Sequence, residues 1–167
     1  MTYKALPETV DPIQLAKQRA VFEGSLPLKQ FTRLSDLLVC TEGEISYRLD
    51  FKMVEGFSII DGSIEADVSM MCHRCMQVVQ EAVVSDFSVK PVYTEEQAAV
   101  HKSDDVALMT DGKLRLHEIL EDEMLLSLPM TVKHESCTTA ETDKIFETDD
   151  ASKVSPFEAL KQLNLKQ

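Results

Sequence analysis

The fold is decided by residues 64–75, IEADVSMMCHRC, in which apolar and polar side chains alternate up to a pair of cysteines. Such alternation is typical of a strand with one buried face. A second alternating stretch, Ile45–Met53, precedes it, and the valine-rich stretch Met76–Val92 follows it. Because strands flank it on both sides, the segment Cys72–Cys75 is predicted to form the tip of a β-hairpin.

The remaining strand signals are shorter. Phe57–Ile60 is predicted to form a short strand that ends at a turn, Asp61-Gly62. The alternation within Met76–Val92 slips once, which predicts a bulge in that strand. Together these stretches predict an antiparallel meander of about four strands, and Val106–Met109 is an expected addition at its edge.

Helix signals lie on both sides of the predicted sheet. Asp11-Pro12 has the form of an N-cap followed by proline at the first helical position, so a helix is expected over Pro12–Val21. A second helix is expected to start near Pro27, and the apolar spacing in Leu116–Leu128 predicts a central helix. The predicted fold class is α+β: an antiparallel β-sheet meander with N-terminal helices, one central helix and a short C-terminal helix.

Composition suggests one domain with a tail. Residues 1–140 are expected to form a single α+β domain with an N-terminal helical arm, residues 141–155 an acidic linker, and residues 156–167 a C-terminal helix. The last helix carries an apolar stripe that either docks on its own domain or binds a partner. The stripe consists of Phe157, Leu160 and Leu163.

The formal net charge of the 167 residues is −12, and residues 37–167 hold all of the excess with −13. Such a body repels phosphate, so RNA contact is expected only at a basic patch of the N-terminal helices. The patch consists of Lys17, Arg19, Lys29 and Arg33. The acidic body either attracts a basic protein or only keeps the protein soluble. No apolar run approaches a membrane span, and a cytoplasmic protein without membrane contact is expected.

Cysteine and histidine recur in two closely spaced pairs. Cys72 and Cys75 are separated by two residues, and so are His134 and Cys137. These are the spacings of two zinc half-sites, and four such ligands complete a structural zinc site. Two alternatives remain open: the residues are packed thiols and a surface histidine, or Cys72 and Cys75 form a redox dithiol. The redox alternative is weaker because the pair leads into a strand and not into a helix that would stabilise a thiolate.

Other chemical signals are weak. Glu121-Asp122-Glu123 are consecutive in a predicted helix and cannot converge on one point, so they are interpreted as a solvated face. Cys40 follows an apolar helix and is interpreted as a core residue. Neither a glycine-rich phosphate loop nor a nucleophile elbow is present in the sequence, which argues against an enzyme.

The motifs in this order resemble the YceD family, named for large ribosomal RNA subunit accumulation, over nearly the whole chain. The motifs are Leu6-Pro7 with Asp11-Pro12, Met71–Cys75, Glu121–Pro129, His134 with Cys137, and Ser155–Leu160. The resemblance implies a non-enzymatic ribosome biogenesis factor that promotes accumulation or processing of large-subunit (23S) ribosomal RNA. Its expected partners are that RNA, a basic large-subunit ribosomal protein, or both. The alternative function is a thiol-dependent oxidoreductase that uses Cys72 and Cys75.

Overall fold

The computed structural model describes residues 2–3, 5–100 and 105–137 of the chain. The chain divides into two compact units, Met1–His134 and Glu135–Gln167. The described strands and helices all belong to the first unit. The predicted linker 141–155, the predicted helix 156–167 and the stripe Phe157, Leu160 and Leu163 lie outside the described residues.

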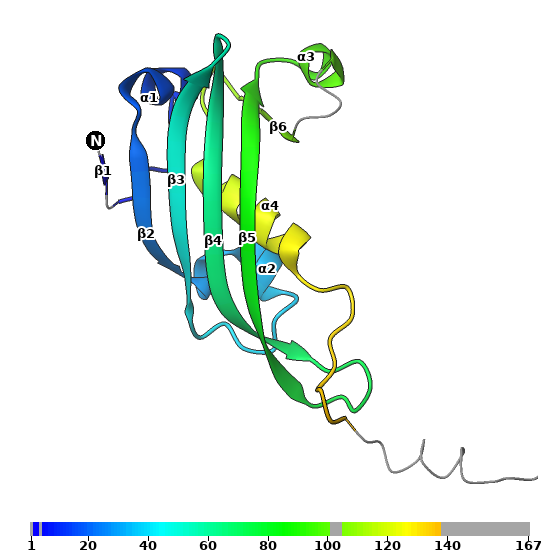
Figure 1. Cartoon of the computed structure of the whole chain (residues 1–167). Helices are drawn as coiled ribbons and strands as arrows, with labels where there is room; N and C mark the ends of the chain where they lie inside the picture. Colours follow the sequence, from blue (N-terminus) through cyan, green and yellow to red (C-terminus); the bar gives the residue numbers. More distant parts are fainter. Residues whose placement is uncertain (1, 4, 101–104, 138–167) are drawn as a thin grey trace, which may run out of the picture. The chain divides into compact units, whose positions relative to one another are not determined.

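Within the described residues, six strands form one sheet in the order β1-β2-β3-β4-β5-β6 (Figure 1). The strands are β1 (Thr2–Tyr3), β2 (Val21–Pro27), β3 (Glu44–Val54), β4 (Phe57–Met71), β5 (Val78–Val92) and β6 (Asp105–Leu108). The helices are α1 (Pro12–Gln18), the 3-10 helix η1 (Leu28–Gln30), α2 (Thr32–Ser35), α3 (Glu95–Val100) and α4 (Leu116–Ser127).

The predicted α+β class is confirmed. Strands β2 to β5 form an antiparallel meander, and each neighbours the next along the chain. The short outer strands β1 and β6 pair in parallel with β2 and β5. None of the helices in the described part of the chain has both the length and the apolar character that a membrane span requires.

The core lies on one face of the sheet, because the helices α2 and α4 both cover that face (Figure 1). Alternate residues of β3 and β4 point into it, as the strand periodicity predicts. Helix α4 contributes the fully buried side chains of Leu116, Leu120 and Met124. The opposite face is polar, with exposed residues such as Ser46, Arg48 and Glu65.

The expected turn at Asp61-Gly62 is wrong, because β4 runs without a break through both residues. Gly62 pairs with Phe87 of β5. A Cβ atom at Gly62 would lie 2.1 Å from the Phe87 ring, so only glycine leaves room for that ring. The glycine therefore serves packing within the sheet and not a change of chain direction.

The expected bulge in the strand that follows Cys75 is absent where β5 pairs with β4, from Val78 to Val89. The register of β4 and β5 is unbroken from Ile60 opposite Val89 to Met71 opposite Val78. The alternation slips because Val84 points to the open face of the sheet, where 66% of it is exposed. A valine on the surface therefore produced a sequence pattern that resembles a shift in register.

The helix predictions hold with changes in length. Asp11 caps α1 as predicted: its Oδ1 accepts hydrogen bonds from the backbone N–H groups of Ile13 and Gln14 at 2.9 and 3.0 Å. The helix expected from Pro27 onward is two short pieces, η1 and α2, because Phe31 between them has an extended backbone. The central helix is present as α4 and ends one residue before the predicted end.

Candidate metal centre

Cys72 and Cys75 lie in the tight connection between β4 and β5. The backbone N–H of Cys72 donates to the Gln77 carbonyl at 2.8 Å, and the N–H of Met76 donates to the Cys72 carbonyl at 3.0 Å. Met76 adopts a positive φ of 59°, which closes the turn. This short closed loop keeps both cysteines at the tip of the hairpin, as the sequence predicts.

His73 ties the hairpin tip to the segment after α4. Its backbone N–H donates to the Val132 carbonyl at 2.9 Å, and its Nδ1 accepts from the Val132 N–H at 2.9 Å. Val132 itself is buried. This reciprocal pair holds the chain just before His134 beside the two cysteines, a role that sequence reasoning missed because it depends on residues 59 positions apart.

His134 has a defined orientation. Its Nε2 lies 3.0 Å from the Val78 carbonyl, and its Nδ1 lies 3.4 Å from the Cys75 sulfur. A carbonyl oxygen only accepts, so Nε2 carries the hydrogen and Nδ1 of the neutral ring keeps its lone pair for the cysteine side. Metal-ligating histidines commonly have their other ring nitrogen bonded in this way.

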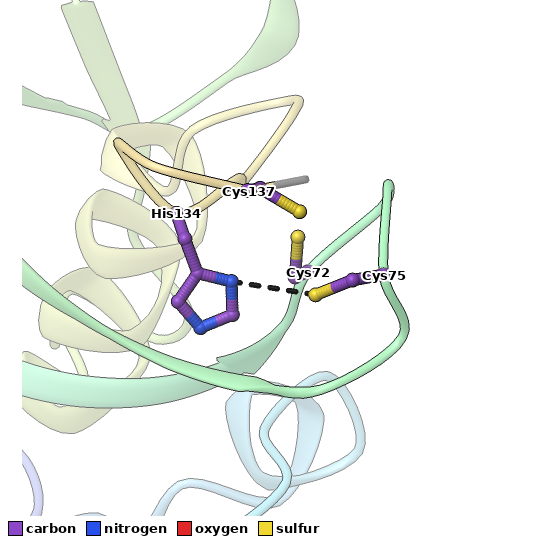
Figure 2. Close-up of side chains that lie close together, drawn as sticks. All are labelled: Cys72, Cys75, His134 and Cys137. Carbon is purple, nitrogen blue, oxygen red and sulfur yellow. Dashed lines mark hydrogen bonds between the residues drawn. The ribbon is translucent and has the colours of Figure 1, made fainter. Parts of the chain in front are cut away.

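The structure brings the four predicted ligands together (Figure 2). The donor atoms of Cys72, Cys75, His134 and Cys137 all lie within 4.8 Å of one another. Zinc–sulfur bonds of about 2.3 Å in a tetrahedron place the sulfur atoms about 3.8 Å apart. Cys72 and Cys137 are buried, and the other two are half-buried. Three thiols and an oriented imidazole at these separations fit a structural zinc ion.

The local electrostatics favour a thiolate at Cys72. The backbone N–H of Cys75 is the main cause that lowers the pKa of the Cys72 thiol from 9.0 to about 5; the N–H groups of Arg74 and His134 add to it, and burial opposes it. The pKa of His134 is raised, chiefly by its interaction with the Cys72 sulfur and then by the Val78 carbonyl. Zinc binds the thiolate form of cysteine, so the lowered pKa of Cys72 suits metal binding, whereas at His134 zinc has to displace the proton that the raised pKa favours.

Cys40 lies outside this cluster of four ligands. The cysteine is half-buried and not a full core residue, and its sulfur accepts a hydrogen bond from the Glu42 N–H at 3.4 Å. It pairs across an isolated bridge with Ser69.

The four predicted RNA-binding residues do not form one patch. Lys17 and Arg19 lie at α1, whereas Lys29 and Arg33 lie in η1 and α2. The seven residues of β2 separate the two pairs, a span of about 23 Å at the usual rise of a strand. Each pair is therefore a separate candidate contact.

Arg33 is engaged by α4. Its guanidinium contacts Glu121 Oε2 at 3.0 Å and Asp122 Oδ1 at 2.6 Å. Both carboxylates raise the pKa of Arg33, Asp122 more than Glu121. A phosphate would have to compete with two carboxylates for this side chain, so the pair of Lys17 and Arg19 is the better candidate for RNA.

The expectation of a solvated carboxylate face is wrong for Glu121, which is only 6% exposed. Its Oε1 accepts hydrogen bonds from the backbone N–H groups of Arg33 and Leu34 at 2.8 and 3.3 Å. The side chain therefore caps the start of α2 while it pairs with the Arg33 guanidinium. Asp122 is exposed, as expected. The sequence gives no signal for this clamp because its partners are 88 residues apart.

The family model described as "Large ribosomal RNA subunit accumulation protein YceD" matches residues 60–164. The chain belongs to the YceD family. The match includes the hairpin tip, α4 and all four candidate ligands, and the predicted resemblance is confirmed. The chain is also 29% identical over 175 residues to the large ribosomal RNA subunit accumulation protein YceD of Haemophilus influenzae, with 97% of each chain covered. No solved structure gives a significant match.

Proposed function

We propose that this protein is a non-enzymatic assembly factor of the large ribosomal subunit that promotes accumulation or processing of its 23S ribosomal RNA in the cytoplasm. Membership of the YceD family carries the proposal, because the family and the Haemophilus influenzae relative are both named for large-subunit ribosomal RNA accumulation. The described residues support a binding role. Three cysteines and one histidine, namely Cys72, Cys75, Cys137 and His134, gather in a partly buried cluster at a hairpin tip.

We propose that Cys72, Cys75, His134 and Cys137 hold a structural zinc ion. The metal would supply a crosslink between the hairpin tip and the segment after α4, adding to the hydrogen bonds that His73 already makes with Val132.

The alternative of a thiol oxidoreductase has less support. Cys72 is fully buried, so a substrate cannot reach its sulfur, and the pair opens a strand-to-strand turn and not a helix. The similarity to YceD proteins adds nothing in favour of that alternative.

The proposed partners are ribosomal RNA, a basic large-subunit protein, or both. On the open face of the sheet, Arg48 pairs with Glu23 and Asp50, and Lys52 pairs with Asp61. Cations already paired with carboxylates attract phosphate poorly. We therefore assign RNA contact to the end of α1, at Lys17 and Arg19, and protein contact to the acidic surface.

Recovery of native complexes tests these partners. Tagged full-length protein isolated at low salt is expected to carry large-subunit RNA or a basic large-subunit protein, and added salt should reduce the yield because it screens both contacts. The double variant Lys17→Gln, Arg19→Gln should recover less RNA, with a flatter salt dependence. The matched control Lys113→Gln, Lys133→Gln removes the same charge from other positions and should behave as wild type. Recovery of neither partner above a tag-only control would contradict the proposal.

A further inference from the structure

Strand β6 is the outer strand beside β5 (Figure 1). A groove of about 600 Å³ is lined by residues of α4 and β6. Apolar side chains from both elements line it, among them Val106, Ala107 and Leu125. Two more apolar side chains of the lining are open to solvent: Leu108 is 53% exposed and Leu126 is 80% exposed. The groove is large enough for several side chains of another molecule.

Carboxylates share this lining with the apolar side chains. The lining contains four acidic residues and one cation, namely Asp105, Glu118, Asp122, Glu123 and Arg115. Arg115 pairs with Glu118 at 2.7 Å, and Asp122 pairs with Arg33 at 2.6 Å. Within the described part of the chain, Asp105 and Glu123 form no ion pair. The lining is therefore negative, and Arg115 within it is already paired with Glu118.

The carboxylates also act on one another. Burial is the main cause that raises the pKa of Glu123, and the charges of Asp105 and Asp122 raise it further. A cation placed between Asp105 and Glu123 would relieve this like-charge repulsion. Phosphate would increase it, which argues against RNA in this groove.

We propose that the groove between α4 and β6 binds a basic, amphipathic segment of a partner protein. Apolar side chains of that segment contact Leu108, Leu125 and Leu126, and its lysine or arginine side chains pair with Asp105 and Glu123. Charge complementarity speeds such an encounter and selects basic partners, whereas the apolar contact holds the complex together. The inference rests on the proposed function and deepens it, because it names the surface that receives a basic large-subunit protein.

A defined peptide tests this directly. The probe is a synthetic amphipathic helical peptide of leucine, lysine and alanine, titrated into the full-length protein and followed by calorimetry at low salt. The variant Asp105→Asn, Glu123→Gln should bind about tenfold more weakly, and so should Leu126→Ser. Glu65→Gln, Asp67→Asn removes the same charge from the open sheet face, and Val84→Ser removes an exposed apolar side chain there. Both controls should stay within about twofold of wild type.

Two further probes decide the nature of the occupant. A scrambled peptide of the same composition, in which leucine and lysine no longer segregate, should bind weakly. If the groove variants and the sheet-face controls weaken peptide binding equally, the inference is overturned, since the peptide would then be attracted only by the negative charge of the whole protein. Displacement of the peptide by a single-stranded RNA oligonucleotide, or by a peptide of residues 155–167, would overturn it in favour of another occupant.

Folding must be separated from binding. The thermal midpoint of the Asp105→Asn, Glu123→Gln variant should equal or exceed that of wild type, because the variant removes crowded carboxylates. If this stable variant binds the peptide as wild type does while ribosomal RNA accumulation in cells still requires the protein, the groove inference fails and the proposed function stands. If accumulation does not require the protein, the proposed function fails.

Discussion

Replacing Cys72 with serine is expected to release about one zinc ion per chain and to destabilise the fold. The four donor atoms lie within 4.8 Å of one another, and the loss of one thiolate leaves three ligands (Figure 2). A metal that binds only the folded state stabilises it by about 4 kcal/mol when free metal exceeds Kd a thousandfold, so the variant should lose stability of that order. Metal content and urea denaturation measure the two effects.

Cys40→Ser is the matched control, because Cys40 is half-buried and outside the cluster. It should keep its zinc and lose less than about 1 kcal/mol. Purified wild-type protein without metal, with a thermal midpoint that neither zinc nor a chelator changes, would contradict the zinc assignment.

A fall in pH should weaken both the stability of the metal-free protein and its binding of zinc at the same four residues. Because the pKa of Cys72 is lowered from 9.0 to about 5 in the folded metal-free protein, its thiolate stabilises the fold fully above the ordinary thiol pKa. That contribution falls as the pH falls through this range and is lost below about 5. Protons also compete with zinc for the thiolates and for His134, so acid should release the metal.

Replacing Glu121 with alanine is expected to cost about 2–4 kcal/mol, since it removes a charged acceptor from two backbone N–H groups and leaves a small cavity. The N–H groups of Arg33 and Leu34 lose their partner, and the Arg33 guanidinium loses its buried contact. The free energy of unfolding from urea titration measures the loss. An unchanged slope of that free energy against urea concentration would show that the denatured state is unaltered.

Asp122→Ala removes the neighbouring carboxylate, which also contacts Arg33 but is exposed. An exposed ion pair contributes little, so this control should lose less than about 1 kcal/mol. Equal losses for the two variants would contradict the role of Glu121 as a buried clamp between α4 and α2.

The parts of the fold that depend on local periodicity could be predicted from the sequence. Alternation located β3, β4 and β5, and the apolar spacing located α4, because both patterns arise from residues close in the chain. The remaining meander strand, β2, was not predicted, since Val21 was expected to end a helix and Pro27 to begin another. The turn expected at Asp61-Gly62 was wrong because Gly62 makes room for the ring of Phe87 on the next strand. That contact cannot be seen in the local sequence. The bulge expected in the strand after Cys75 is absent from its paired part for a similar reason, since a surface valine such as Val84 and a core valine look alike in sequence.

The candidate metal centre was predictable in its ligands but not in its support. The paired spacing of cysteine and histidine identifies the four residues, because each pair places two metal-binding side chains only three positions apart in the sequence. The bonds that bring the pairs together, from His73 to Val132 and from His134 to Val78, join distant residues without any local pattern. The clamp of Glu121 on α2 and the acidic groove beside β6 arise in the same way, from elements that meet only after folding.

The most direct test of the proposed function is the ratio of large-subunit to small-subunit ribosomal RNA in cells that lack this protein. We predict a ratio below that of the parent cells, restored by the wild-type protein and by Cys40→Ser but not by Cys72→Ser. An unchanged ratio in cells that lack the protein would contradict the proposed function.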